Sequence, residues 1–311
     1  MLENSGRTFH AHCMRIPTRH DHGLGSRTHG VVILRNGLVA VLAQARPALH
    51  FFESDGTLVD AWGEDLSGAH GLTHTSEDDE EFLWITDQIS GQVSKRTTSG
   101  RIVQKIDRPA ATEGEYSPTW VAVAPVSRDV WVADGYGSNQ VRRYTSAGVP
   151  LGTITGLEGP GHFARPHGIG FASDGTALVA DRRNHRILRY DRHGNYLAHW
   201  DDLTHSPCGF AFRDGNIYIP ELFGDLKVFN ASFGLIETLA TNLAVRPAKG
   251  WPDQPGWGWP TLTGWPDMLT ENLKSTLIAP HACAISDLGE IYTVEWVLGG
   301  RISRIGRDSI V

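Results

Sequence analysis

The chain has 311 residues, of which 40% are hydrophobic and 20% are charged, a composition typical of a folded protein rather than a disordered one. Its net charge of −7 argues against a dedicated binder of nucleic acid or of an anionic membrane, so we expect neither as a partner. No apolar run reaches the roughly 18 residues of a membrane helix. Residues 1–25 lack the apolar segment of a signal peptide. The three cysteines are too scattered for a disulfide framework, which favours a cytoplasmic protein.

Two segments, 117–144 and 165–190, repeat one pattern of residues. Each begins with a short apolar run, turns into a second run that ends in Val-Ala-Asp, and reaches a third run after a polar loop. A fourth run follows each segment, at 150–157 and 196–203. Valine, isoleucine, tyrosine and tryptophan alternate or cluster within these runs, which is the spacing of strands and not of helices.

The same unit can be placed along the whole chain. Its lead positions are His29, His70, Trp120, His167, Cys208 and His281. Four short antiparallel strands in every 40–50 residues or so are typical of a β-propeller blade. We therefore predict one all-β domain over residues 1–311, a six-bladed β-propeller, which fits six matching units better than a pair of β-sandwiches.

The last unit has only three runs after its lead histidine, and residues 8–16 are the candidate for the missing outer strand. A strand from the N-terminus would then close the last blade and remove its open edges.

An insertion at residues 244–272 interrupts the regular spacing before the last unit. It holds four of the ten tryptophans together with five prolines. One interpretation is a loop that packs on itself over an apolar patch. The other is a wall over a pocket, in which Trp257 and Trp259 contact an apolar part of a substrate.

Histidines lead alternate units of the predicted propeller, at His70, His167 and His281. Alternate blades are related by three-fold symmetry, so these three imidazoles are expected to meet at the channel. Three histidines with one open position are the ligand set of a catalytic zinc, although other divalent transition metals suit imidazole as well. The alternative is that the histidines only line the channel. His29 is a candidate for a fourth ligand, a partner of a ligand or a substrate contact, and Cys208 could replace one histidine.

The residues that follow the second runs carry further chemistry. Aspartates end three of these runs: Asp87, Asp134 and Asp181. We expect them to accept backbone hydrogen bonds in the following turns. Tyr136 and Arg182 come directly after, and Arg46 lies in the corresponding loop of the first unit. A phenol can transfer a proton and a guanidinium can hold a carboxylate, although both residue types are also common on surfaces.

The segment PHGIGFASDGTALVADRRNHRILRY resembles an NHL repeat. Together with the histidines, it makes the chain similar to the peptidyl-α-hydroxyglycine α-amidating lyases, which are six-bladed NHL-type propellers with a tri-histidine zinc. The resemblance implies zinc ligands in AHGL, RPHGI and APHAC, at His70, His167 and His281. It also implies an active-site tyrosine at Tyr136 in DGY and catalytic arginines at Arg182 and Arg46.

Two positions depart from that family's pattern. The family has a calcium-binding aspartate after the last zinc histidine, where this chain has Ala282, so calcium is not expected. The family also has a disulfide cysteine after DGY, where this chain has Gly137.

Three functions stay open at the level of sequence. The leading hypothesis is a zinc-dependent lyase that acts on an α-hydroxylated amide, a hemiaminal or a related small hydroxy-carbonyl compound. A zinc-dependent hydrolase of a lactone, ester or amide would use the same residues and would incorporate oxygen from water into its product. The third is a non-enzymatic NHL interaction platform, which would bind no metal.

Overall fold

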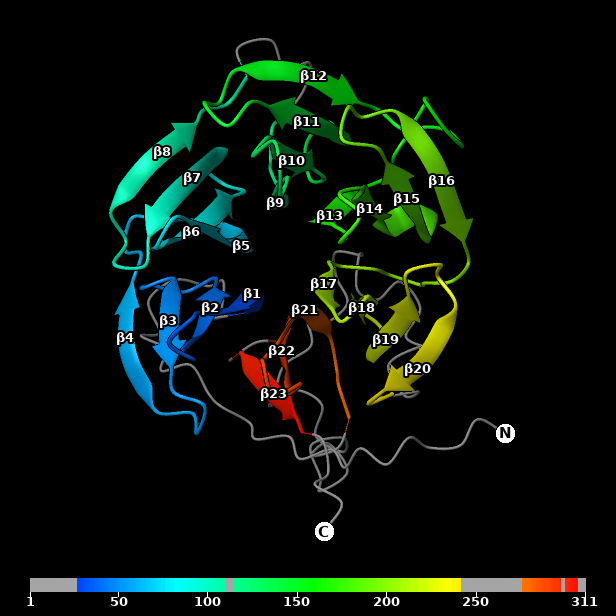
Figure 1. The fold of residues 1–311 in the computed structure, drawn as a ribbon. Helices are drawn as coiled ribbons and strands as arrows, with labels where there is room; N and C mark the ends of the chain where they lie inside the picture. The colour runs from blue at the N-terminus through cyan, green and yellow to red at the C-terminus, as the bar shows by residue number, and fades with distance from the viewer. Residues whose placement is uncertain (1–26, 110–114, 242–275, 298–299, 307–311) are drawn as a thin grey trace. The chain divides into compact units, whose positions relative to one another are not determined.

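The computed structural model describes residues 27–109, 115–241, 276–297 and 300–306, and it is built from antiparallel β-sheets (Figure 1). Five sheets have four strands and one has three, and consecutive strands of the chain are neighbours in each sheet. The fold class is an all-β six-bladed β-propeller, as the repeat predicts. Among the described residues, no helix is long and apolar enough to cross a membrane.

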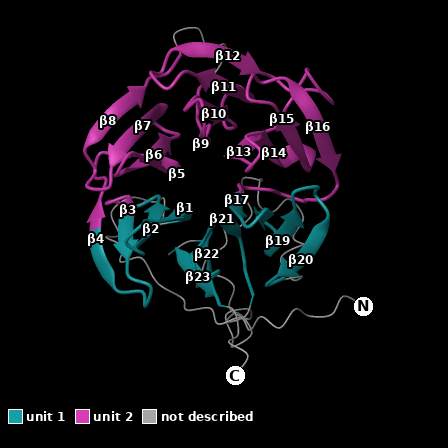
Figure 2. Ribbon diagram, in the orientation of Figure 1, with its two compact units in different colours: residues 1–45, 50–60, 211–311 teal, residues 46–49, 61–210 magenta. Residues whose placement is uncertain are grey.

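The described chain divides into two compact units (Figure 2). Unit 2 comprises residues 46–49 and 61–210. Its first sheet contains β5 (Ala69–Glu77), β6 (Glu80–Asp87), β7 (Gln92–Thr97) and β8 (Ile102–Ile106). Its second contains β9 (Trp120–Val123), β10 (Val130–Asp134), β11 (Gln140–Tyr144) and β12 (Pro150–Ile154). Its third contains β13 (Pro166–Phe171), β14 (Ala177–Asp181), the 3₁₀ turn η1 (Arg182–Asn184), β15 (Arg186–Tyr190) and β16 (Tyr196–Asp201).

Unit 1 comprises residues 1–45, 50–60 and 211–311. The sheet of β1 (Thr28–Ile33), β2 (Val39–Ala43), β3 (Leu49–Phe52) and β4 (Leu58–Trp62) belongs mostly to unit 1. The next contains β17 (Ala211–Arg213), β18 (Asn216–Glu221), β19 (Asp225–Asn230) and β20 (Leu235–Leu239). The three-stranded sheet contains β21 (Pro280–Ile285), β22 (Ile291–Glu295) and β23 (Arg301–Ile305).

Burial decreases from the second strand of a sheet to the fourth. All residues of β10 and β14 are buried, whereas most residues of β8 and β12 are exposed. The sequences follow this gradient, because VWVAD and ALVAD are nearly all apolar. The turns predicted at SAG, SDG and RHG contain Gly148, Gly175 and Gly194 at φ values of 83°, 80° and 86°, which L-residues with a side chain rarely adopt.

Apolar side chains pack between neighbouring sheets inside each unit. In unit 2 one cluster joins the first two sheets: Trp84, Val93, Ile106, Val121, Val130, Val132 and Tyr144. In unit 1 another joins the β17–β20 sheet to the β21–β23 sheet: Tyr218, Leu226, Val228, Leu239, Leu277, Cys283, Ile291 and Ile305. This burial of apolar surface is the main force that holds the two sheets of each pair together.

Five of the six lead positions lie in the first strand of a sheet, as predicted. The exception is Cys208, because β17 begins three residues later at Ala211. The Cys208–Gly209 backbone instead passes so close to Gly168 of β13 that a Cβ at Gly168 would lie 2.4 Å from the Cys208 carbonyl oxygen. The strand predicted at 8–16 and the insertion at 244–272 lie outside the described residues, as do Trp257 and Trp259.

Candidate active site

Four histidines share one structural position, the second residue of a sheet's first strand. They are His29 in β1, His70 in β5, His167 in β13 and His281 in β21. The pairing with the second strand shifts register around each of them, as at a β-bulge. All four side chains are buried. A bulge redirects the side chain at the end of a strand, which explains why the histidines occur at the same place in each repeat.

Backbone carbonyl groups orient all four imidazoles, and in His29 the Nδ1 lies 3.2 Å from the Arg27 oxygen. Nδ1 lies 2.8 Å from the Thr119 oxygen in His70, 2.7 Å from the Cys208 oxygen in His167, and 2.7 Å from the His29 oxygen in His281. A carbonyl oxygen only accepts hydrogen bonds, so Nδ1 carries the proton in each ring. In the neutral imidazole, Nε2 then presents its lone pair, which is the arrangement of a metal-ligating histidine with a carbonyl partner.

In unit 2 the histidine of β5 and the histidine of β13 are each followed by a glycine. A Cβ at Gly71 would lie 2.6 Å from the Thr119 oxygen, and one at Gly168 would lie 2.4 Å from the Cys208 oxygen. These are the same two carbonyl oxygens that accept from the histidines. The glycines therefore allow the neighbouring backbone to come close enough to hold each imidazole.

The hydroxyl of Tyr136 lies at the centre of a cluster in unit 2. Its oxygen is 3.3 Å from Nε2 of His70, 3.3 Å from Nε2 of His167 and 3.3 Å from Nη2 of Arg182. The two imidazole rings are themselves 5.0 Å apart between centroids. We call His70, Tyr136, His167 and Arg182 the tyrosine cluster.

Charge and burial keep the first histidine of the cluster neutral. Burial and, to a smaller extent, the positive charge of Arg182 lower the pKa of His70 to about 3, against the opposing effect of its hydrogen bond to Thr119. Arg182 is itself buried, and its Nη1 lies 3.9 Å from the thiol sulfur of Cys208. At neutral pH the cluster thus combines a neutral imidazole with a fixed cation.

A second arginine reaches the same tyrosine. The Arg165 Cζ lies 5.4 Å from the centroid of the Tyr136 ring, and the Arg182 Cζ lies 5.6 Å from it. Sequence reasoning did not select Arg165. Its only signal is its place in RPHGI, two residues before His167, and the backbone conformation that brings it to the tyrosine is a property of the folded chain.

Aspartates at the ends of the second strands hold the site's loops, as predicted. Asp134 accepts hydrogen bonds from the backbone N–H groups of Ser117 and Ser138, so it ties the segment before β9 to the Tyr136 loop. Asp181 accepts from the Ala164 N–H and from Nε of Arg186, beneath Arg182. Burial raises the pKa of Asp181. These carboxylates support the site and do not face the tyrosine cluster.

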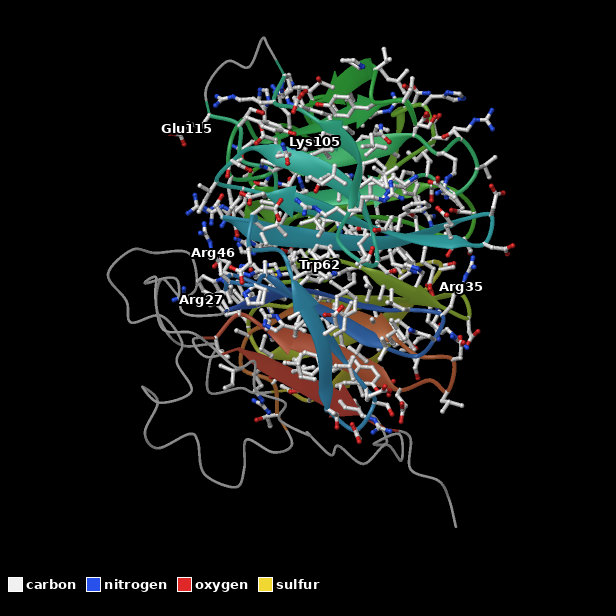
Figure 3. The ribbon with its side chains drawn as sticks, turned by 90° about the vertical axis from the view of Figure 1, so that its left-hand side faces the viewer. Arg27, Arg35, Arg46, Trp62, Lys105 and Glu115 are labelled. Atoms are coloured by element: carbon white, nitrogen blue, oxygen red, sulfur yellow. The ribbon has the colours of Figure 1, made fainter. Side chains whose placement is uncertain are left out.

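Three more of the predicted site residues lie within the described chain. Arg46 is exposed in the loop between β2 and β3 (Figure 3), and no described contact joins it to the tyrosine cluster. His29 and His281 belong to unit 1, where their ring centroids are 4.7 Å apart. The roles assigned to these three residues stay predictions.

The donor set of the tyrosine cluster fits a transition metal. Two buried imidazoles direct Nε2 toward one point, their Nδ1 protons are held by carbonyls, and at least His70 is neutral. Neutral imidazole nitrogen is the commonest protein ligand of zinc and suits several other divalent metals. The thiol of Cys208, buried beside Arg182, is a further donor of a type that zinc accepts.

Comparison with known proteins agrees with this description. The NHL repeat family matches residues 163–190. NHL repeat-containing protein 3 of Homo sapiens is 28% identical over 202 residues, which cover 59% of this chain and 58% of that protein. A probable peptidyl-alpha-hydroxyglycine alpha-amidating lyase of Caenorhabditis elegans is 27% identical over 177 residues, which cover 54% of this chain and 46% of that protein. The matches thus span about half of each relative's length.

Among solved structures, a streptogramin B lyase superimposes with a TM-score of 0.61 over 97% of this chain and 98% of its own. The two sequences are 13% identical, so the likeness shows a shared fold.

Proposed function

We propose that this chain, an NHL-repeat propeller distantly related to the peptidyl-α-hydroxyglycine α-amidating lyases and to NHL repeat-containing protein 3, is a metal-dependent lyase. Its substrate would be a small α-hydroxylated amide or another hemiaminal. The observation that carries the proposal is the position of the Tyr136 hydroxyl, 3.3 Å from Nε2 of both His70 and His167 and from Nη2 of Arg182.

Zinc is the metal that we propose. His70 and His167 would hold it through Nε2, and His281 is the third ligand that the sequence repeat predicts. When bound, the metal would supply a Lewis acid that polarises an oxygen of the substrate. Because carbonyl groups hold Nδ1 of all three histidines, the protein side of such a site needs no rearrangement of protons.

Cleavage of an N-acyl hemiaminal requires one proton to move. The carbon–nitrogen bond breaks, its electron pair goes to the amide nitrogen, and the hydroxyl-bearing carbon becomes an aldehyde carbon. The proton of the substrate hydroxyl is lost and the nitrogen gains one, so no water is consumed. Tyr136 would serve as the relay by giving its phenolic proton to the nitrogen while its oxygen takes the hydroxyl proton.

Arg182 would stabilise negative charge and would not itself transfer a proton. Its guanidinium is buried and donates to the Tyr136 oxygen, so it stabilises negative charge that develops there during the transfer. Its aspartate neighbour Asp181 accepts hydrogen bonds from Asn184 and Arg186.

Turnover of N-acetyl-α-hydroxyglycine in ¹⁸O-labelled water tests the proposal. We expect acetamide and glyoxylate in equal amounts, with no label in the acetamide. Label in the carboxyl product of an ester or lactone substrate, without turnover of the hemiaminal, would instead establish a hydrolase. Absence of turnover with every hemiaminal tested, in protein loaded with zinc, would overturn the lyase.

A further inference from the structure

Arg165 has a backbone conformation that arginine seldom adopts. Its φ is 64°, in the left-handed region, and the next residue is Pro166. A residue before proline ordinarily takes an extended conformation, and a non-glycine residue at positive φ carries a conformational cost. Such strain persists only where surrounding contacts hold it, and it is concentrated at sites of function.

The contacts that hold Arg165 come from the two loops of the tyrosine cluster. The Arg165 N–H donates to Oδ1 of Asn139 at 2.9 Å, and Asn139 follows Tyr136 in the same loop. The Arg165 carbonyl oxygen accepts from the Arg182 N–H at 3.1 Å. Both backbone groups of the strained residue are thus bonded to the segments that carry the proposed catalytic side chains.

The residue after Arg165 makes further contacts with the segments around the tyrosine cluster. The Pro166 carbonyl oxygen accepts from the Thr119 hydroxyl at 3.2 Å, and a Cβ at Gly135 would lie 2.3 Å from that same carbonyl oxygen. The loop that begins at Gly135 therefore passes against the backbone at Pro166. This close approach places the backbone next to Arg165 against the loop that carries Tyr136.

The side chain of Arg165 lies beside Tyr136. Its guanidinium carbon is 5.4 Å from the ring centroid, within the range of a cation–π contact, and the residue is half-buried whereas Arg182 is buried. Two guanidinium groups thus lie at one tyrosine, one of them more accessible than the other. A guanidinium binds a carboxylate through two parallel hydrogen bonds, and Arg is preferred where planar anions are recognised.

We propose that Arg165 is a specificity-determining residue that binds a carboxylate of the substrate beside Tyr136. It takes the part that the sequence assigned to Arg46, which is exposed in the β2–β3 loop. The inference rests on the proposed lyase function and narrows its substrates to carboxylated hemiaminals, in which the carboxylate and the hydroxyl share one carbon.

A pair of substrates that differ only in this charge tests the inference. N-acetyl-α-hydroxyglycine carries the carboxylate, and its primary amide replaces the carboxylate with a neutral group of nearly the same shape. A charge-assisted hydrogen bond contributes about 1.5–3 kcal/mol, so wild-type protein should prefer the acid by about 10- to 100-fold in kcat/KM. Arg165→Asn should remove this preference, mainly by raising the KM of the acid.

Asparagine is the informative replacement because it tolerates the left-handed region better than arginine does. We expect the Tm of Arg165→Asn to equal or exceed that of wild type, so loss of preference would not come from unfolding. Arg165→Lys keeps the positive charge but cannot form the two parallel hydrogen bonds of a guanidinium, so it should retain part of the preference. The matched control is Arg192→Gln, an exposed arginine in the turn before β16, which should behave as wild type.

Binding of an unreactive acid separates this inference from the lyase proposal. N-acetylglycine and N-acetylglycinamide lack the hydroxyl, and their Kd values can be measured by NMR titration. Tighter binding of the acid that disappears in Arg165→Asn would support the carboxylate site even if no hemiaminal turns over. Equal loss of activity on both substrates in Arg165→Asn, or equal binding of N-acetylglycine to wild type and variant, would overturn it.

Discussion

At the scale of single residues, the proton on Nδ1 determines what the buried histidines can do. In both His70 and His167 the Nδ1–H donates a hydrogen bond to a carbonyl oxygen, and Nε2 points toward Tyr136. An imidazole held in this way behaves as a ligand or acceptor rather than as an acid. The low pKa of His70, about 3, agrees with this role because a ligand must be neutral.

Removal of either imidazole should remove the metal. We expect about one zinc or similar ion per chain in wild type and a large loss in His70→Ala and in His167→Ala, measured by elemental mass spectrometry. His74→Ala is the matched control, since His74 lies on the same strand β5 but is partly exposed and paired with Glu81 at 2.8 Å. Metal retained in both His70→Ala and His167→Ala would show that the cluster is not a metal site.

Loss of the Tyr136 hydroxyl should affect chemistry and leave the metal in place. Proton transfer by a positioned side chain contributes roughly 10²–10⁴ in rate, so kcat of Tyr136→Phe should fall by about that factor while metal content and Tm change little. Tyr196→Phe on β16 is the control, because its hydroxyl bonds to His199 away from the cluster. An unchanged kcat in Tyr136→Phe would exclude the phenol as the proton relay.

At the scale of elements, a bulge in the inner strand and the glycine after it act together. The bulge turns the histidine, and the missing side chain of Gly71 or Gly168 lets the next segment bring its carbonyl to Nδ1. The His-Gly pair in these repeats therefore acts as a unit, in which the glycine makes room for the carbonyl that orients the histidine. It explains why an imidazole of fixed orientation occurs at the start of these strands.

Alanine at Gly168 tests this role of the glycine. Its Cβ would lie 2.4 Å from the Cys208 oxygen, so the carbonyl must move away from Nδ1 of His167. Overpacking of this kind costs about 1–3 kcal/mol, measurable by urea unfolding, and we expect metal affinity to fall as well. Gly306→Ala is the control because nothing lies within 4 Å of the added Cβ. Wild-type stability and metal affinity in Gly168→Ala would contradict the account.

The strand β7 supplies a pH-dependent contribution to stability. Its Arg96 donates to Asp65 at 3.1 and 2.7 Å, and the guanidinium carbon of Arg96 lies 5.8 Å from the ring centroid of Trp62. The hydrogen bonds from Arg96 lower the pKa of Asp65 below its ordinary value of 3.8. A carboxylate with a lowered folded-state pKa stabilises the protein above the ordinary value and loses that effect as pH falls through the folded one.

Asp65→Asn should therefore lower Tm at pH 7, and the difference from wild type should shrink as pH falls below about 4. The comparison is Asp107→Asn, an exposed aspartate just after β8, which should leave Tm unchanged at both pH values. A difference between Asp65→Asn and wild type that stays constant from pH 7 to pH 3 would rule out the ion pair as its cause.

At the scale of the whole molecule, the candidate residues come from both compact units. The tyrosine cluster lies in unit 2, and His281 lies in unit 1 with its Nδ1 held by the His29 carbonyl oxygen. The third metal ligand is thus a prediction from the repeat, and mutation of unit 1 decides it.

We expect His281→Ala to lose the metal as His167→Ala does. His29→Ala should keep it, because the oxygen that holds Nδ1 of His281 is the backbone oxygen of residue 29, which alanine retains. Elemental analysis of the two variants, each checked for a wild-type circular dichroism spectrum, makes the comparison. Metal lost in His29→Ala as well would make His29 a ligand, and metal retained in His281→Ala would remove His281 from the site.

Much of the architecture was predictable because repetition is visible in a sequence. Strand spacing, turn glycines and the recurrent Val-Ala-Asp specify sheets of four short strands, and the last unit, in which three runs were expected, supplies the strands β21 to β23. Asp134 accepts a backbone hydrogen bond from Ser138 in the following turn, as expected, whereas the backbone donor to Asp181 is Ala164, which precedes β13. Five lead positions fell in the first strand, whereas Cys208 precedes β17, which begins at Ala211.

What the sequence determined by itself was the fold class and which residue types recur at equivalent points of each blade. Both depend on local spacing, which each segment carries within itself. Only the tertiary structure showed which side chains meet: Tyr136 contacts His70, His167 and Arg182, carbonyl groups hold the Nδ1 protons of the histidines, and Arg165 lies beside the tyrosine. Such contacts join segments far apart in the chain, and the positive φ of Arg165 exists only because Asn139 and Arg182 hold its backbone.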